Sequence, residues 1–156
     1  MHLNHRWFRI LLNIWSPFRG AGIKVRSVTP DFRHVIVDLK APRWKRNYVG
    51  THFGGSLYAM TDPFYMLMLM RNLGRDYWVW DKTASIDYLT AASGVVSAHF
   101  RLSEGQIQAI RDATATGDKH LPEFHIDIVD AQGTVVARVH RTLYVRLKKD
   151  RRPSVD

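Results

Sequence analysis

The sequence contains no cysteine among its 156 residues, and this absence removes several kinds of chemistry. Without thiols the chain has no disulfide bond, no cysteine-ligated zinc ion and no thiolate nucleophile. Because the chain has no disulfide bond to form, a reducing compartment fits it at least as well as any other, and we expect a cytoplasmic location.

Long apolar runs are also absent from the sequence. No uncharged stretch reaches the roughly 18 residues that a membrane-spanning helix requires. An apolar run near the N-terminus is interrupted by Arg9 and Asn13, and no small-residue cleavage site follows it. We therefore expect neither a membrane span nor a secretory signal.

Acidic residues are scarce in this chain. Asp and Glu total 14 against 23 Lys and Arg, which leaves a formal net charge of +9. Such a surplus suits nucleic acid, an anionic membrane surface or a phosphate-bearing ligand. We expect no nucleic-acid partner, because the sequence has no base-stacking motif and the basic cluster at 146–152 is more simply a solvated tail.

The length and the apolar content predict a single folded domain. Apolar residues make up 46% of the sequence, which is enough for a packed core. A chain of this length has the size of one ordinary domain. We divide it into an N-terminal helical segment (1–19), a main domain (20–147) and a basic tail (148–156).

Residues 3–15 are predicted to form an amphipathic helix that Ser16 and Pro17 end. Apolar residues recur there at helical spacing, while Arg6 and Arg9 fall on other faces. We favour a helix docked on the domain or at a subunit contact over a basic helix lying on membrane lipid. The apolar positions are Leu3, Trp7, Ile10, Leu11, Ile14, Trp15 and Phe18.

The rest of the sequence predicts an α+β fold. The stretch 56–72 is nearly all apolar and predicts a buried helix, with a kink or restart at Pro63. Strands gathered around one long helix, without strand–helix alternation, favour an antiparallel sheet packed on that helix. Period-two alternation predicts the strands at 23–28, 35–39, 77–91, 94–102, 124–128 and 135–145, with a short helix within 103–117.

The stretch Asn47–Asp62 holds the residues best suited to chemistry. Gly54 and Gly55 stand where a loop enters the buried helix, so free N–H groups there favour an oxygen that gains negative charge. Asp62 follows about two turns later, where burial raises a carboxyl pKa and suits it to act as a base or nucleophile. The alternatives are a tight turn that binds nothing, for the glycines, and a helix N-cap before Pro63, for Asp62.

The same stretch resembles the signature of hot-dog thioesterases of the phenylacetate-degradation type. That signature combines an asparagine, a histidine-glycine-glycine turn and a helix acid. In this sequence the resemblance is carried by Asn47, Gly50, Gly54, Gly55 and Asp62.

A longer resemblance points to an uncharacterised bacterial hot-dog family that is described as thioesterase-like. It covers Gly20–Arg146 and implies a hot-dog fold, in which a mostly antiparallel sheet wraps a long central helix. Its most similar segments are Asn47–Met70, Trp80–Lys82 and Ser85–Asp87.

The resemblance also implies a function and a set of site residues. It implies an acyl thioester of CoA or acyl-carrier protein as substrate and a homodimer or homotetramer. We expect no cofactor, and no metal because the histidines have no spacing that demands one. By carry-over, the Gly55 amide polarises the thioester carbonyl, Asp62 of the partner subunit drives hydrolysis, and Asn47 orients water or thioester. Residues assigned to substrate binding are His52, Phe53, Gly54 and Ser56, with Arg43 and Arg46 for the CoA phosphates.

Two departures from the thioesterase signature leave a second function open. Phe53 occupies the position of the signature histidine, with His52 one place earlier, and Pro63 follows the acid. The two hypotheses are therefore an acyl-CoA thioesterase and a non-catalytic protein that binds an acyl-CoA.

Overall fold

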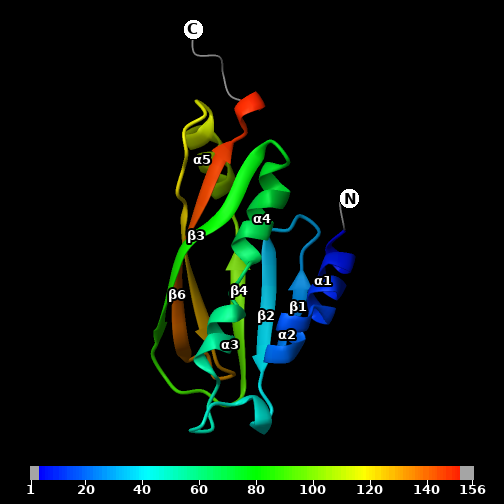
Figure 1. Ribbon diagram of the computed structural model, residues 1–156, viewed down its shortest axis with the longest axis vertical. Coiled ribbons are helices and arrows are strands. Elements are labelled where there is room, and N and C mark those ends of the chain that lie inside the picture. Colours follow the sequence, from blue (N-terminus) through cyan, green and yellow to red (C-terminus); the bar gives the residue numbers. More distant parts are fainter. Residues whose placement is uncertain (1–3, 152–156) are drawn as a thin grey trace.

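The computed structural model describes residues 4–151, which form a six-stranded antiparallel sheet with helices packed against it (Figure 1). The order across the sheet is β1-β2-β4-β5-β6-β3, so β1 and β3 are its two edges. The strands are β1 (Ile23–Val28), β2 (His34–Lys40), β3 (Tyr77–Tyr88), β4 (Val95–Arg101), β5 (Glu123–Val129) and β6 (Val135–Leu147).

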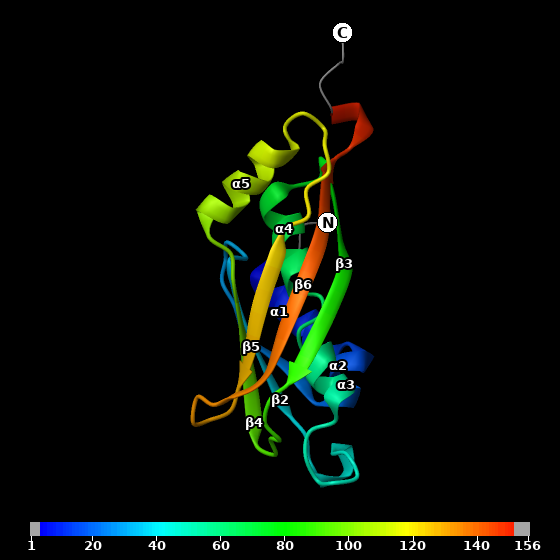
Figure 2. The same ribbon diagram turned by 90° about the vertical axis from the view of Figure 1, so that its left-hand side faces the viewer.

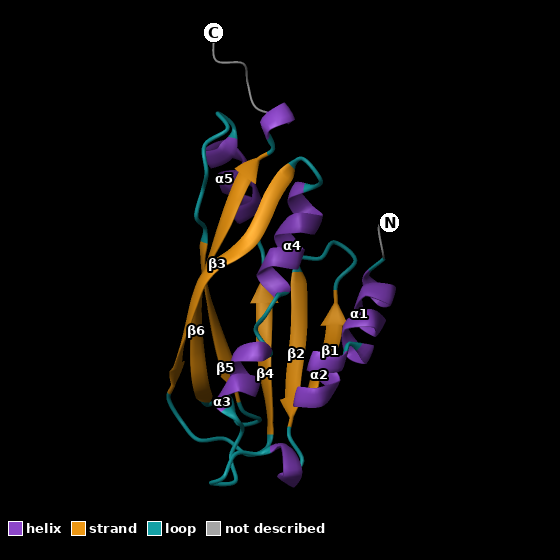
Figure 3. Ribbon diagram, in the orientation of Figure 1, coloured by secondary structure: helices purple, strands orange, loops and turns teal. Residues whose placement is uncertain are grey.

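Two consecutive helices cross the sheet where the sequence predicts one buried helix (Figure 3). The interruption falls between Met60 and Pro63, because proline has no N–H to continue the backbone ladder. The predicted kink is thus confirmed. The helices are α1 (His5–Ile14), α2 (Ser16–Ala21), α3 (Gly54–Ala59), α4 (Phe64–Leu73) and α5 (Glu104–Thr114), with short 3-10 turns η1 (Arg43–Lys45) and η2 (Lys149–Arg151).

The core lies between α3, α4 and the inner face of the sheet. Phe64 at the start of α4 is fully buried, with its ring centroid 4.8 Å from that of Phe100 on β4. Tyr65 stacks on Phe124 of β5 at 4.0 Å. Aromatic pairs of this kind add about 1 kcal/mol each beyond their area burial, so they fix α4 at one position across the sheet.

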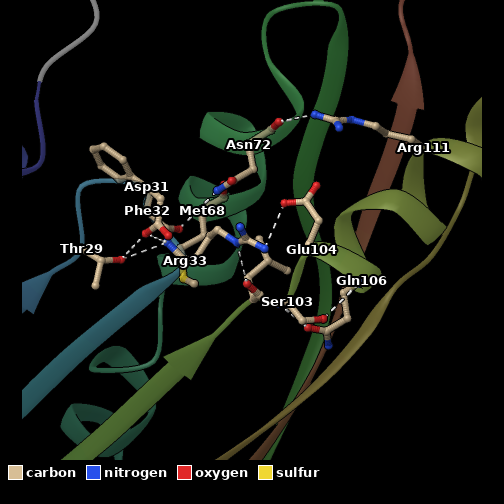
Figure 4. Close-up of polar contacts among 11 residues, drawn as sticks. Thr29, Asp31, Phe32, Arg33, Met68, Asn72, Ser103, Glu104, Gln106 and Arg111 are labelled. Atoms are coloured by element: carbon tan, nitrogen blue, oxygen red, sulfur yellow. Dashed lines mark hydrogen bonds and ion pairs between the residues drawn. The ribbon is translucent and has the colours of Figure 1, made fainter.

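Polar contacts hold the C-terminal end of α4 between the β1–β2 turn and α5 (Figure 4). The Asn72 side chain donates to the Phe32 carbonyl at 3.3 Å, and the Arg111 guanidinium donates to the Asn72 carbonyl at 2.8 Å. Arg33 forms an ion pair with Glu104 at 3.0 Å. With α4 held at its end, the residues between α3 and α4 have a defined position over the sheet.

Helix α1 docks along the edge strand β1 (Figure 1). Phe8 and Leu12 pack against the core, and the Asn13 side chain bonds both backbone groups of Val25: Nδ2 donates to its carbonyl at 3.0 Å and Oδ1 accepts from its N–H at 2.8 Å. The favoured prediction of a docked helix is confirmed for the described residues. Leu3 lies outside them, as do tail residues 152–156.

Replacing Asn13 tests this docking. Asn13→Ala leaves the N–H and carbonyl of the buried Val25 without these partners, so we expect a loss of about 2 kcal/mol in the free energy of unfolding. Urea denaturation measures the loss. An unchanged midpoint would show that the Asn13 clamp does not hold α1 on the sheet.

Candidate active site

The loop before α3 lies near the C-terminal end of β3 (Figure 2). A cavity of about 500 Å³ opens between them. The opposite wall comes from 88–92, where the chain leaves the sheet after Tyr88 rather than continuing to residue 91 as predicted. The cavity brings together five of the residues predicted from the sequence: Asn47, His52, Phe53, Gly54 and Gly55.

The amides of Gly54 and Gly55 are the first two of α3 and donate to no acceptor among residues 4–151. Neither glycine has a positive φ, so the turn does not need the backbone freedom of glycine. The missing side chains instead make room for two rings. A Cβ at Gly55 would collide with the Phe53 ring, and one at Gly54 would lie 2.9 Å from the Tyr88 hydroxyl. Two unbonded amides therefore lie beside a cavity, with the exposed Phe53 and Tyr88 side chains next to the two glycines.

Asn47 is fully engaged in closing its own loop. Its Nδ2 donates to Thr51 Oγ1 at 2.8 Å and to the His52 carbonyl at 3.2 Å, while its Oδ1 accepts from the Thr51 amide at 2.9 Å. The side chain thus shapes the cavity wall, and its hydrogen-bonding groups are already occupied by the loop.

His52 is a buried, neutral wall of the cavity. Its Nε2 lies 2.7 Å from the Gly94 carbonyl, which can only accept, so the Nε2 proton is present. Burial lowers the pKa of His52 below the ordinary 6.5, and the neighbouring Arg46 lowers it further, against the raising effect of the Gly94 bond. A neutral His52 supplies no positive charge to a substrate near pH 7.

The two arginines assigned to phosphate binding differ in their surroundings. Arg46 directs its guanidinium at the carbonyls of Ala41, Gly50 and Ser93, at 3.2 to 3.5 Å, and so ties the loop to the β3–β4 connection. Arg43 is exposed on η1. Ser56 is buried in α3 and does not line the cavity.

Asp62 lies outside this cavity, in the break between α3 and α4. Its carboxylate is 53% exposed and lies 3.9 Å from Nη1 of Arg141. The same nitrogen is 2.9 Å from the Asp81 carboxylate on β3, and Arg141 itself is only 2% exposed. A buried arginine therefore stands between two acids, one of which is Asp62.

The environment of Asp62 changes its acidity. Burial raises the pKa of its carboxyl above the ordinary 3.8, the Arg141 guanidinium lowers it, and the Asp81 carboxylate raises it, with a net rise. Asp62 is not the N-cap of α4, because Pro63 occupies that position and no side chain caps the helix. The capping explanation for Asp62 is therefore wrong.

Arg141 is not among the residues predicted from the sequence, although a signal for it is present. Inward residues of β6 alternate, and Val139, Leu143 and Val145 are fully buried. Arg141 falls on the same parity and is the one charged residue in that buried series. A charge in an apolar period-two series indicates a buried ion pair, and its partners, Asp62 and Asp81, come from distant segments.

Residues 4–145 match a family defined as a domain of unknown function, DUF4442. The chain belongs to this family. The match covers most of the sequence, and it confirms the predicted resemblance to an uncharacterised family. No curated protein matches the chain.

Solved structures similar to this DUF4442 chain have the hot-dog fold. A protein of unknown function from Pseudomonas aeruginosa, described as a probable thioesterase, superposes with a TM-score of 0.81 at 18% identity, over 95% of this chain and 99% of its own. A thioesterase from Haemophilus influenzae gives 0.67 at 15% identity, over 94% and 93%. The E. coli PaaI protein from the phenylacetic acid degradation operon gives 0.60 at 14% identity, over 94% and 97%. The hot-dog fold expected from the sequence is confirmed.

The buried charges make Arg141 important for stability. Arg141→Met leaves Asp81 and Asp62 without their cation, so we expect a loss of about 3 kcal/mol in the free energy of unfolding. Urea denaturation at pH 7 measures it. The matched control is Arg138→Met, on the same strand as Arg141. It breaks an exposed ion pair with Asp127 of β5 and is expected to cost less than about 1 kcal/mol. Equal losses would contradict the role given to burial.

The raised pKa of Asp62 predicts that replacing this carboxyl stabilises the protein, and that the gain depends on pH. The folded state binds the Asp62 proton more tightly than the unfolded state, so the ionised carboxylate weakens folding at neutral pH. We expect Asp62→Asn to unfold at a higher temperature than wild type at pH 7, and this difference to shrink as the pH falls through the raised pKa. A difference that grows toward acid pH would contradict the direction of the shift.

Proposed function

We propose that the protein hydrolyses an acyl thioester, with the Gly54–Gly55 amides binding the carbonyl oxygen and Asp62 activating water. The observation that carries this proposal is the pair of unbonded amides at the N-terminus of α3, which open onto a cavity. Such amides stabilise an oxygen that becomes negative as the carbonyl is attacked. Structural similarity to proteins described as thioesterases supports the same class of reaction.

The proposed reaction has two balanced steps. The Asp62 carboxylate accepts a proton from water while the water oxygen bonds to the carbonyl carbon, whose oxygen becomes an anion held by the glycine amides. The anion then re-forms the carbonyl as the carbon–sulfur bond breaks, and the proton on Asp62 passes to the departing thiolate. A base with a raised pKa suits both transfers, because it holds and returns a proton near neutral pH.

We further propose a homodimer in which each site takes Asp62 from the partner subunit. Asp62 does not line the cavity of its own chain, and β3 is an edge strand with twelve residues whose outer side is unpaired in the sheet. Long edge strands readily pair with another chain. A two-fold axis through two paired β3 strands keeps both pairs of helices on one face of the joined sheet, and so turns the acid of one subunit toward the glycine turn of the other.

The remaining site residues are given supporting roles in this proposal. Asn47 positions the loop, and His52 is part of the wall. Phe53 and Tyr88 lie over the glycines and move aside when the thioester binds. The proposed substrate is a cytoplasmic acyl-CoA. Arg43 is a better candidate than Arg46 for binding its CoA phosphates, because the Arg46 guanidinium is already bonded to backbone carbonyls.

A second function is favoured by one observation, the Phe53 ring over Gly55. If that ring stays in place, the amides remain covered and the cavity holds an acyl-CoA without cleaving it. Binding alone raises the unfolding temperature in the presence of ligand, and no thiol appears.

Thiol release from acyl-CoA substrates with short, medium, long and aromatic acyl groups tests these functions. We expect release by the wild type and a loss of about a hundredfold or more in Asp62→Ala and Asp62→Asn. Asp127→Asn, an exposed acid on β5, is the matched control and should keep full activity. Release that survives both Asp62 variants would disprove its role as base. No release by the folded wild type, with stabilisation by ligand, would favour the binding function.

Mixing two inactive variants tests the shared site. Gly55→Val blocks the amides and Asp62→Ala removes the base, so each homodimer has no intact site. A heterodimer combines an intact glycine turn with an intact acid at one of its two sites, which should restore roughly a quarter of wild-type activity after subunit exchange. No recovery, with exchange verified by differently tagged subunits, would show that each site uses its own Asp62.

A further inference from the structure

Helix α1 turns its apolar stripe away from the protein. Trp7, Ile10, Leu11 and Ile14 recur at the spacing that places side chains on one helical face. Their exposed fractions are 58%, 41%, 43% and 58%. Trp15, directly after the helix, is 47% exposed. An amphipathic helix on a soluble domain normally buries this face, so the stripe on α1 is unexplained by the fold.

The opposite side of α1 makes the contacts with the domain. Phe8 and Leu12 pack on the core, and Asn13 bonds the Val25 backbone. The Arg9 guanidinium donates to the Arg26 carbonyl at 3.3 Å. These contacts fix the rotation of α1 about its axis, so the stripe cannot turn inward without breaking the Asn13 bonds.

The surroundings of the stripe carry positive charge. Residues 1–30 contain no Asp or Glu. Exposed basic side chains lie on α1, α2 and β1, next to the stripe in the chain: Arg6, Arg9, Arg19, Lys24 and Arg26. Of these, Arg26 pairs with Asp38 at 3.5 Å. An apolar face with tryptophan, flanked by basic residues, is the composition of helices that lie in the interface of an anionic membrane.

We propose that α1 binds the surface of an anionic lipid bilayer, with the Trp7–Ile14 stripe inserted among the lipid headgroups. This is attachment to one leaflet: no helix within residues 4–151 is long and apolar enough to cross a membrane. Helix α1 lies at the β1 edge, across the sheet from β3 (Figure 1). A dimer joined at β3 therefore leaves both copies of the stripe uncovered.

A second copy of the chain is a poorer occupant for this surface. A two-fold contact places each residue near its own copy, so basic residues around the stripe would meet the same basic residues with no acid in this segment to offset them. The stripe also covers only about one heptad, which is short for a coiled coil. An anionic lipid surface can bury the apolar face and attract the basic residues.

Vesicle sedimentation tests the proposal with the full chain. The vesicles are phosphatidylcholine alone and phosphatidylcholine with about 30% phosphatidylserine, a composition with a negative surface potential. We expect binding to the anionic vesicles that weakens as salt rises. The variant Trp7→Ser/Ile14→Ser should bind roughly tenfold more weakly or worse, because two inserted side chains are lost. Trp44→Ser/Val49→Ser removes two apolar residues elsewhere that are even more exposed, and this variant should bind like wild type.

Three outcomes would overturn the proposal. Wild type that stays in solution with anionic vesicles removes it, as does equal weakening by the Trp7/Ile14 and Trp44/Val49 variants. Sedimentation velocity without lipid gives the third: an assembly larger than a dimer that the Trp7/Ile14 variant loses would assign the stripe to a second copy. Matching thermal unfolding of variants and wild type establishes that each is folded, and thioesterase activity plays no part in any readout.

Discussion

The Arg141 side chain of β6 carries a guanidinium into the apolar core, where it lies near β3 and the break that separates α3 from α4. A charge in that position is tolerated only with opposite charge close by, and the Asp81 carboxylate at 2.9 Å supplies it, while the half-exposed Asp62 lies 3.9 Å from the same nitrogen. The contact couples the sheet to the helix break. The candidate base therefore lies beside the buried cation whose charge Asp81 balances.

The two halves of the proposed site have opposite physical requirements. The Gly54–Gly55 turn needs unbonded amides near a cavity, and the two glycines accept the rings of Phe53 and Tyr88 where a Cβ would not fit. Asp62 needs partial burial to raise its pKa, yet enough exposure to meet water. One chain provides both environments but keeps them in different places, which is the physical reason for proposing a site shared by two subunits.

The two edges of the sheet differ in whether another element covers them. At the β3 edge the outer side of the strand has no partner within the sheet and is open to pairing with a second copy. At the β1 edge the backbone of Val25 is already bonded by Asn13, and α1 covers the strand while its own apolar stripe faces outward. In our proposals the molecule pairs with a second copy at one edge of the sheet and meets lipid at the other. Such an arrangement would bring the cavities near a source of acyl groups.

Local patterning in the sequence determined the strands, the amphipathic helix, the buried helical stretch and its break at Pro63, because alternation and proline act over a few neighbouring residues. Residue type and spacing likewise singled out Gly54, Gly55 and Asp62 as candidates, although the structure places Asp62 in the break between α3 and α4 and not within a helix. Only the tertiary structure decided that the Asn47 side-chain amide bonds its own loop, that Asp62 caps no helix and that Asp62 lies beside Arg141. It also decided which face of α1 points outward, since helical periodicity identifies an apolar stripe but only long-range contacts such as Asn13 to Val25 fix its direction.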